Sequence, residues 1–171
     1  MKKLLLVIFI ISPIPVYGQY ADIYSDNPVD RQFETDSDKL YSSMKWSTGT
    51  QTELYYIYAD IWDAELNNVY QLLMEMIEPE YREQLRDSQR AWLEHYELEQ
   101  EFQKNILSNG GELAFSWVNG SLGIMEWAGD IMNKKRERTL ELIRLYNILV
   151  YEYTEYSKDN KDYRFLFGNE G

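Results

Sequence analysis

Cysteine is absent from the 171-residue sequence, and histidine occurs only once. Without cysteine the chain has no disulfide bond, thiol nucleophile, thiolate metal ligand or lipid-anchoring cysteine. The one histidine, His95, lies in "LEHYE", and the Glu-x-x-His motif of metal-binding helices would need an acid at position 92, which is Trp92. We therefore expect no metal, no cofactor and no catalytic histidine, and we interpret His95 as a partly exposed helix residue.

Basic residues are also few: 17 Lys and Arg stand against 29 Asp and Glu, which gives a net charge of −12. A nucleic-acid-binding protein needs a basic patch to contact phosphates, so no nucleic-acid partner is expected. An acidic chain suits a cationic partner. The same charge also serves solubility alone, and composition does not decide between these two interpretations.

Long apolar runs are missing except at the start, "MKKLLLVIFIISPIPVYGQYA". Two lysines precede an apolar run over residues 4–11, and a proline-containing stretch ends in Val-Tyr-Gly. This order is typical of a secretory signal peptide, and the run is too short to span a bilayer. We predict cleavage between Gly18 and Gln19, which leaves 153 residues with 15 basic and 29 acidic side chains, or −14. The mature protein is then periplasmic or secreted, without stable membrane insertion.

Proline and glycine are sparse, and several of them separate long helical patterns. Residues 19–49 are acidic and weakly patterned, which predicts an irregular arm with room for a short helix near residues 38–46. After Gln51, apolar side chains recur every three or four residues until Glu78-Pro79, where proline ends the helix. The inward set of this helix is Leu54, Tyr58, Ile61, Trp62, Leu66, Val69, Leu73 and Met76.

Two further long helices follow, one from Pro79 to the glycines after Asn109 and one from Leu122 to about Tyr156. The second helix should point Tyr81, Leu85, Trp92, Tyr96, Phe102 and Ile106 inward. The third should bury Met125, Ala128, Met132, Thr139, Leu142, Tyr146, Leu149 and Tyr153. We predict an all-α fold, an antiparallel bundle of three long helices with an irregular N-terminal arm. The domain spans residues 50–156, and a polar tail follows at 157–171, of which residues 165–167 could fold back.

Carboxylates crowd the second helix at Glu94, Glu97, Glu99 and Glu101, but they distribute around it, and only Glu99 falls near the apolar stripe. Acid–base catalysis needs a desolvated acid beside an ionised one, so we interpret these residues as a solvated face. The sequence also has no phosphate-binding glycine loop and no serine in a nucleophile turn. An enzyme is therefore not expected.

Four blocks in order carry a resemblance to a known family. They are "TQTEL" from Thr50, "DAELNNVYQLLM" from Asp63, "LRDSQRAWLEHYELEQEF" from Leu85, and Gly120-Ser121 followed by Arg138-Thr139. Between Thr50 and Tyr146 the chain resembles the LprI-type lysozyme inhibitor domain, a small helical domain of exported bacterial proteins. The motif residues are Leu66, Asn67, Tyr70, Gln89, Arg90, Trp92, Arg138 and Thr139.

The chain departs from the family at positions that still indicate a register. The resemblance places cysteines near Gln100 and Asp130 and an arginine at Tyr96, and all three are absent here. If the missing cysteines mark a pairing, the second and third helices are antiparallel, and the numbers of two residues that face each other add up to about 230. The length of the connecting loop indicates the same register. Arg138 then lies opposite Trp92, and Thr139 or Leu140 lies near Gln89. We predict that the guanidinium stacks on the indole and that Gln89 pairs with buried polar groups.

The resemblance implies an exported binding protein that occludes the cleft of a cationic lysozyme, where two carboxylates act. The connection at residues 108–120 is the candidate insertion element, because Phe115 and Trp117 lie on a glycine-flanked loop. These rings could instead plug the end of the bundle. The acidic face at Glu94, Glu97 and Glu101 is the second candidate for partner binding. The alternative function is a cell-envelope structural or adaptor domain that binds another protein or peptidoglycan.

Overall fold

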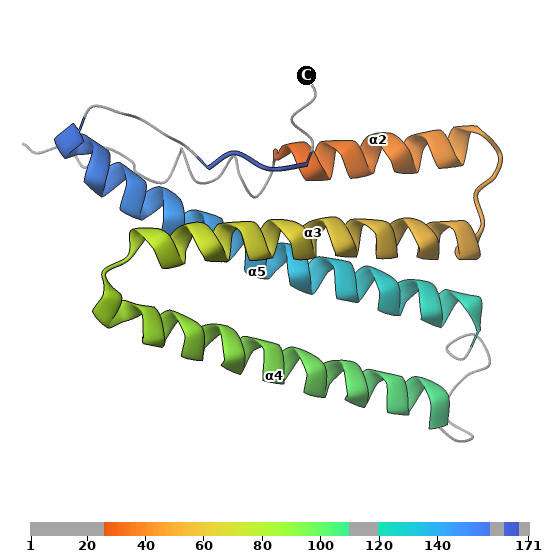
Figure 1. The fold of residues 1–171 in the computed structure, drawn as a ribbon. Coiled ribbons are helices and arrows are strands. Elements are labelled where there is room, and N and C mark those ends of the chain that lie inside the picture. The colour runs from red at the N-terminus through yellow and green to blue at the C-terminus, as the bar shows by residue number, and fades with distance from the viewer. Residues whose placement is uncertain (1–25, 110–119, 158–162, 168–171) are drawn as a thin grey trace, which may run out of the picture.

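The computed structural model describes residues 26–109, 120–157 and 163–167. Within these residues the chain forms four helices and no strand: α2 (Pro28–Ser42), α3 (Thr48–Met76), α4 (Pro79–Asn109) and α5 (Ser121–Ser157). Successive helices run in opposite directions (Figure 1). The all-α class is confirmed, whereas the predicted count of three helices is wrong for this part of the chain. The predicted leader at residues 1–18 lies outside the described residues.

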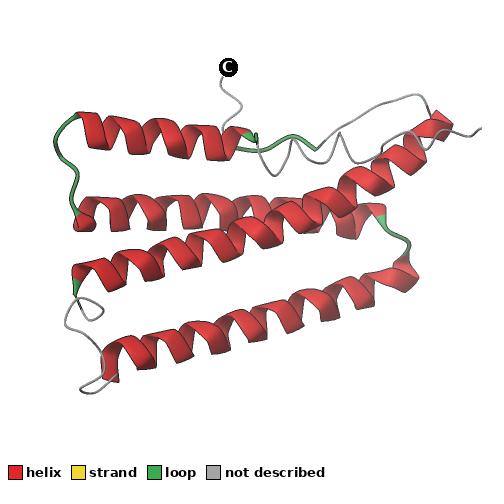
Figure 2. Ribbon diagram, turned by 180° about the vertical axis from the view of Figure 1, so that it is seen from behind, coloured by secondary structure: helices red, strands yellow, loops and turns green. Residues whose placement is uncertain are grey.

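The core of the molecule forms where α3 and α5 pack against each other, as the view from behind also shows (Figure 2). Trp62 and Leu140 are fully buried there, and the Thr139 hydroxyl, itself buried, donates to the carbonyl oxygen of Trp62 at 3.1 Å. The other buried apolar residues of this pair are Tyr58, Ala59, Leu66, Val69, Leu73, Ala128, Met132, Leu142, Ile143 and Val150. The predicted spacing of three and four residues thus identifies both helices. No helix in the described residues is long and apolar enough to cross a membrane.

The N-terminal arm contains a full helix, which corrects the prediction of an irregular arm with a short helix near residues 38–46. The side chain of Asn27 accepts a hydrogen bond from the Asp30 N–H at 2.8 Å, and Pro28 takes the first helical position. These two residues are a start signal that the acidic composition obscures. Only Val29 is fully buried in α2, so its apolar pattern is too thin to reveal the helix.

Polar contacts complete the attachment of α2 to the core. The Arg136 guanidinium of α5 donates to both carboxylate oxygens of Asp30, with Nε–Oδ1 at 2.8 Å and Nε–Oδ2 at 2.9 Å. The Tyr58 hydroxyl donates to Asp36 at 2.8 Å. The Phe33 ring meets the Tyr58 ring edge-on at 5.0 Å. Long-range pairing of this kind is not visible in a local sequence pattern, and it explains why a mostly polar segment is helical.

The helix α4 attaches to the core far less closely than α3 and α5 attach to each other. Of its predicted inward residues, Leu85 is buried and Trp92 and Tyr96 are half-buried. Tyr81, Phe102 and Ile106 are exposed, so their predicted burial is wrong. The reason is that amides and charged side chains, rather than these apolar residues, occupy the α5-facing side over the second half of α4.

The tail folds back onto the core, as its apolar residues suggested. Tyr163 and Phe165 are buried, and the Phe165 ring meets Trp62 edge-on at 6.1 Å. The segment lies beside the start of α2 in Figure 1. Tyr163 and Phe165 therefore belong to the core, whereas Arg164, Leu166 and Phe167 are exposed.

Candidate functional site

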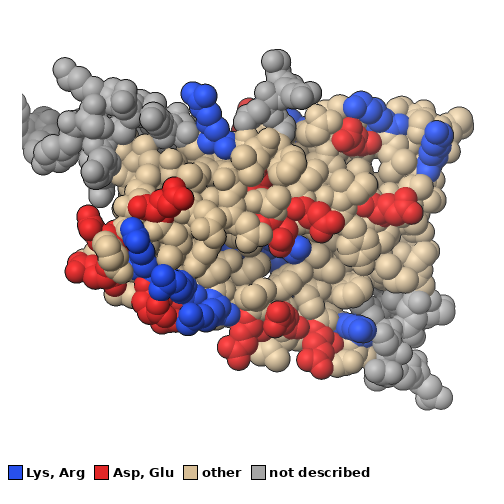
Figure 3. Space-filling view, in the orientation of Figure 1, with Lys and Arg blue, Asp and Glu red and all other residues tan. Residues whose placement is uncertain are grey.

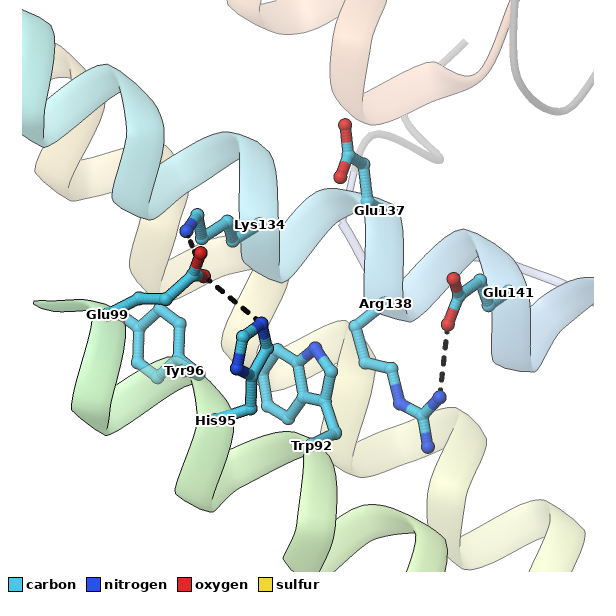
Figure 4. A pocket seen from close by; sticks show the side chains of 8 residues that line it. All are labelled: Trp92, His95, Tyr96, Glu99, Lys134, Glu137, Arg138 and Glu141. Atoms are coloured by element: carbon cyan, nitrogen blue, oxygen red, sulfur yellow. Dashed lines mark hydrogen bonds and ion pairs between the residues drawn. The ribbon is translucent and has the colours of Figure 1, made fainter.

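The seam between α4 and α5 holds a cleft of about 290 Å³. Its lining residues are Trp92, His95, Tyr96 and Glu99 from α4 and Lys134, Glu137, Arg138 and Glu141 from α5 (Figure 4). Thus α5 contributes charged groups of both signs, and α4 contributes one carboxylate, one imidazole and two aromatic rings. This combination makes the seam the candidate site.

The aromatic end of the cleft is a packed cluster. Trp92 and Tyr96 stack with ring centroids 5.4 Å apart and planes 12° apart. Arg138 lies over the Trp92 ring, with its Cζ 5.9 Å from the centroid, and its Nε donates to Gln89 at 3.1 Å. A second guanidinium nitrogen donates to the Ser88 hydroxyl at 3.1 Å. The predicted contact of Arg138 with Trp92 is confirmed, the bond from Arg138 to Gln89 was not foreseen, and together they hold α4 to α5.

The charged end of the cleft is an ion-pair network. The Lys134 ammonium donates to Glu99 and lies 3.5 Å from Asp130, and Asp130 also accepts from Gln103 at 3.1 Å. The hydrogen bond from Lys134 lowers the pKa of Glu99, and the two acids together raise the pKa of Lys134 against the opposing effect of burial. His95 Nε2 lies 3.6 Å from Glu99.

This network does not provide acid–base chemistry. A general acid near neutral pH needs a carboxyl whose pKa is raised, and the pKa of Glu99 moves the other way. Burial, followed by the charges of Asp63 and Asp130, raises the pKa of Tyr96, so its hydroxyl stays protonated. Within the described residues, no group of three His, Cys, Asp or Glu side chains is placed to hold a metal ion. The arrangement is suited to joining two helices.

One buried carboxylate escaped sequence reasoning. Glu65 on α3 is fully buried, and it accepts from the Tyr163 hydroxyl at 2.6 Å and from the Phe167 N–H at 2.8 Å. Asn68 in turn donates to the Tyr163 oxygen at 2.9 Å. Burial raises the pKa of Glu65, and these hydrogen bonds offset only part of that effect. The tail thus satisfies an acid in the core, and only the apolar residues at 165–167 gave any signal of it.

The remaining motif residues divide between core and surface. Leu66 and Thr139 are buried, and Tyr70 packs against the core while partly exposed. Asn67 is exposed, and its amide donates to the Asp63 carbonyl oxygen at 2.9 Å. Arg90 is exposed and pairs with an acid on its own helix at 2.8 Å. Most of the motif residues therefore contribute to the packing of α3, α4 and α5.

The predicted partner-binding residues lie away from the seam or beyond the described chain. Glu94, Glu97 and Glu101 are exposed on α4. Figure 3 shows acidic side chains along the edge formed by α4, mixed with basic ones over the N-terminal half of the helix. Phe115 and Trp117 lie outside the described residues. The acidic face is thus available to a partner, and the aromatic connection remains a prediction.

Comparison with known proteins agrees with the resemblance in the sequence. No curated protein and no solved structure matches the chain. One family model does match, and its description is "Lysozyme inhibitor LprI". The match covers residues 43–142, which is more than half of the chain, and the chain therefore belongs to the LprI lysozyme inhibitor family.

Proposed function

We propose that this protein is an exported inhibitor that binds a cationic lysozyme and occludes its active-site cleft. The family match over residues 43–142 is the observation that carries this proposal. The seam between α4 and α5 supports a binding role, because its acids and bases are spent on each other rather than arranged for catalysis. Inhibition then requires contact with the enzyme and no turnover.

The charge of the chain supports a cationic target. Cleavage after Gly18 would leave −14, and the exposed acids of α4 lie on one edge of the molecule. Opposite charges on the two proteins speed their encounter, and added salt removes most of this gain, because screening acts over about 8 Å at physiological ionic strength. The acidic face at Glu94, Glu97 and Glu101 would thus guide association, while buried anchors would set dissociation.

The direct test is a lysozyme activity assay with the purified mature chain. Inhibition should be stoichiometric, and its association rate should fall steeply with salt. A second measurement asks which surface acts: Phe115→Ala with Trp117→Ala should speed dissociation if the connection at residues 108–120 inserts into the enzyme. Charge reversal at Glu94, Glu97 and Glu101 should slow association instead. Absence of inhibition at micromolar protein and low salt would refute the proposal for that lysozyme.

One observation favours a second candidate, a cell-envelope adaptor that binds another protein without inhibiting an enzyme. Leu98, Phe102 and Ile106 form an exposed apolar row on α4, with spacing that puts them on one face of the helix. A row of this kind suits a partner helix. If the mature chain leaves lysozyme activity intact, this row is the surface to mutate next.

A further inference from the structure

The turn between α2 and α3, residues 43–47, presents an exposed tip. Met44 is 95% exposed and Trp46 is 48% exposed, with the exposed Lys45 between them. The turn protrudes at the end of the molecule where α4 ends and α5 begins (Figure 1). Methionine and tryptophan are enriched where proteins bind partners, and leaving both in water at one tip is unfavourable unless something covers them.

The tip is held in one conformation by its own backbone and by the start of α3. Met44 has a φ of 57°, the left-handed region that a methionine adopts at a cost. The Ser47 hydroxyl accepts from the Thr50 N–H at 3.1 Å, and the Ser47 N–H donates back to the Thr50 hydroxyl oxygen at 2.9 Å. That hydroxyl also lies 3.0 Å from the Lys45 carbonyl oxygen, to which it can donate. A rigid tip loses little entropy on binding.

The charge at the tip differs from that of the rest of the protein. Lys39, one turn of α2 away, is paired with Asp36 at 3.0 Å. No ion pair joins Lys45 to another residue in the part of the chain that the structure describes. The tip thus offers a cation and apolar side chains, whereas the molecule as a whole is strongly acidic.

We propose that this turn is the element that enters the lysozyme cleft, with the Lys45 ammonium facing the pair of carboxylates and Met44 and Trp46 against the walls of the cleft. The inference rests on the proposed function and names the surface that performs it. A cationic enzyme with an acidic cleft matches an acidic inhibitor with a cationic tip. The family match begins at residue 43, so the turn belongs to the matched part of the chain.

Charge also argues against two other occupants. A second copy would bring two strongly acidic molecules and two lysines together, which is unfavourable. An anionic bilayer would repel the same acidic surface. The cleft of a cationic enzyme is therefore the occupant that fits both the tip and its surroundings.

The test compares the mature chain with Met44→Gly/Lys45→Ala/Trp46→Ala in calorimetric or surface-based binding to a cationic animal lysozyme. The matched control is Ile57→Ala/Tyr81→Ala, which removes two exposed apolar side chains, from α3 and α4, that lie on no proposed binding surface. The triple variant should weaken binding by about 30-fold or more, as loss of a hot spot does, while the control changes it by less than about threefold. Thermal unfolding should stay unchanged, because the substituted side chains are exposed.

Two further readouts identify the cleft. A chitin trisaccharide that fills the cleft should compete with the wild-type chain. Replacing the catalytic glutamate of the lysozyme by glutamine should weaken wild-type binding, but not binding of Lys45→Met, with a coupling of about tenfold or more. Lys45→Met keeps the aliphatic stem, so this double-mutant cycle isolates the charge.

The outcomes separate the two proposals. If the wild-type chain neither binds nor inhibits lysozyme, the proposed function is wrong and this assignment is wrong with it. If the wild-type chain binds and the triple variant binds equally well, or the trisaccharide does not compete, only the assignment of the turn is overturned. A wild-type dimer that the triple variant dissolves, or vesicle binding that it abolishes, would also overturn the assignment.

Discussion

Tyr163→Phe removes the hydroxyl group that links the C-terminal tail to α3. In the wild type that hydroxyl donates to a carboxylate oxygen of Glu65 at 2.6 Å and accepts from Asn68 at 2.9 Å. The substitution leaves a buried oxygen and an amide without these partners. A hydrogen bond to a charged group contributes about 1.5–3 kcal/mol, so the free energy of unfolding should fall by that amount at a pH high enough to ionise Glu65.

The cost should depend on pH. Burial raises the pKa of Glu65 in the folded wild type above its unfolded value, which is near 4.3 for a glutamate. Ionising Glu65 therefore costs the folded state no stability below the unfolded pKa. The cost grows as pH rises through the folded pKa. Loss of the Tyr163 donor destabilises the ionised form and therefore raises that pKa further. At pH 4, where Glu65 is protonated, the lost bond joins neutral groups and contributes only about 0.5–1.5 kcal/mol.

Urea unfolding of both chains between pH 4 and pH 8 measures this difference. In a Glu65→Gln background the cost of Tyr163→Phe should no longer change with pH. Tyr56→Phe, which alters a tyrosine that is 37% exposed, is the control and should have almost no effect. A cost that is the same at pH 4 and pH 8, or that stays below about 0.5 kcal/mol throughout, would show that the tail does not satisfy Glu65 in solution.

Three more changes test other parts of the structure. Trp92→Ala should lower the free energy of unfolding by about 2–3 kcal/mol in chemical denaturation. This is less than the roughly 3–5 kcal/mol lost with a fully buried ring, because Trp92 is only half-buried. A loss below about 1 kcal/mol would contradict its packing on Arg138. Met44→Gly should leave the melting temperature unchanged or raise it slightly, since glycine adopts a positive φ without strain; a clear drop would mean that the turn has another conformation. Asp30→Asn should lower the free energy of unfolding by about 1–3 kcal/mol, because it weakens the ion pair with Arg136. Limited proteolysis of this variant should then cleave α2 first, and an unchanged digestion pattern would refute this prediction.

The sequence was sufficient for α3, α4 and α5 because each has a strong local signal. Apolar residues recur at helical spacing through Trp62 and Leu66, Pro79 starts α4, and glycines follow its end. The contact of Trp92 with Arg138 followed from the antiparallel register that the family resemblance and the loop length indicate. Such features depend on residues close in the chain or on helices joined by short connections.

The features that were missed depend on distant partners. The helix α2 is held by Arg136, more than a hundred residues away, and the buried Glu65 finds its hydrogen-bond partners on the returning tail. The outer face of α4 was misjudged for a related reason. Tyr81, Phe102 and Ile106 are as apolar as core residues, and only the position of α5 reveals that they face solvent.

The polar seam between α4 and α5 has a consequence for how the protein opens. Over the second half of α4, these two helices bury little apolar surface against each other, and ion pairs and amide contacts join them instead. A low-cost partial unfolding is therefore the departure of α4 as one unit from an intact α3–α5 pair, with the extended backbone at Ile77 as its hinge. Amide protons of α4 would then exchange with solvent through this opening long before those of the core, and faster still as salt weakens the seam.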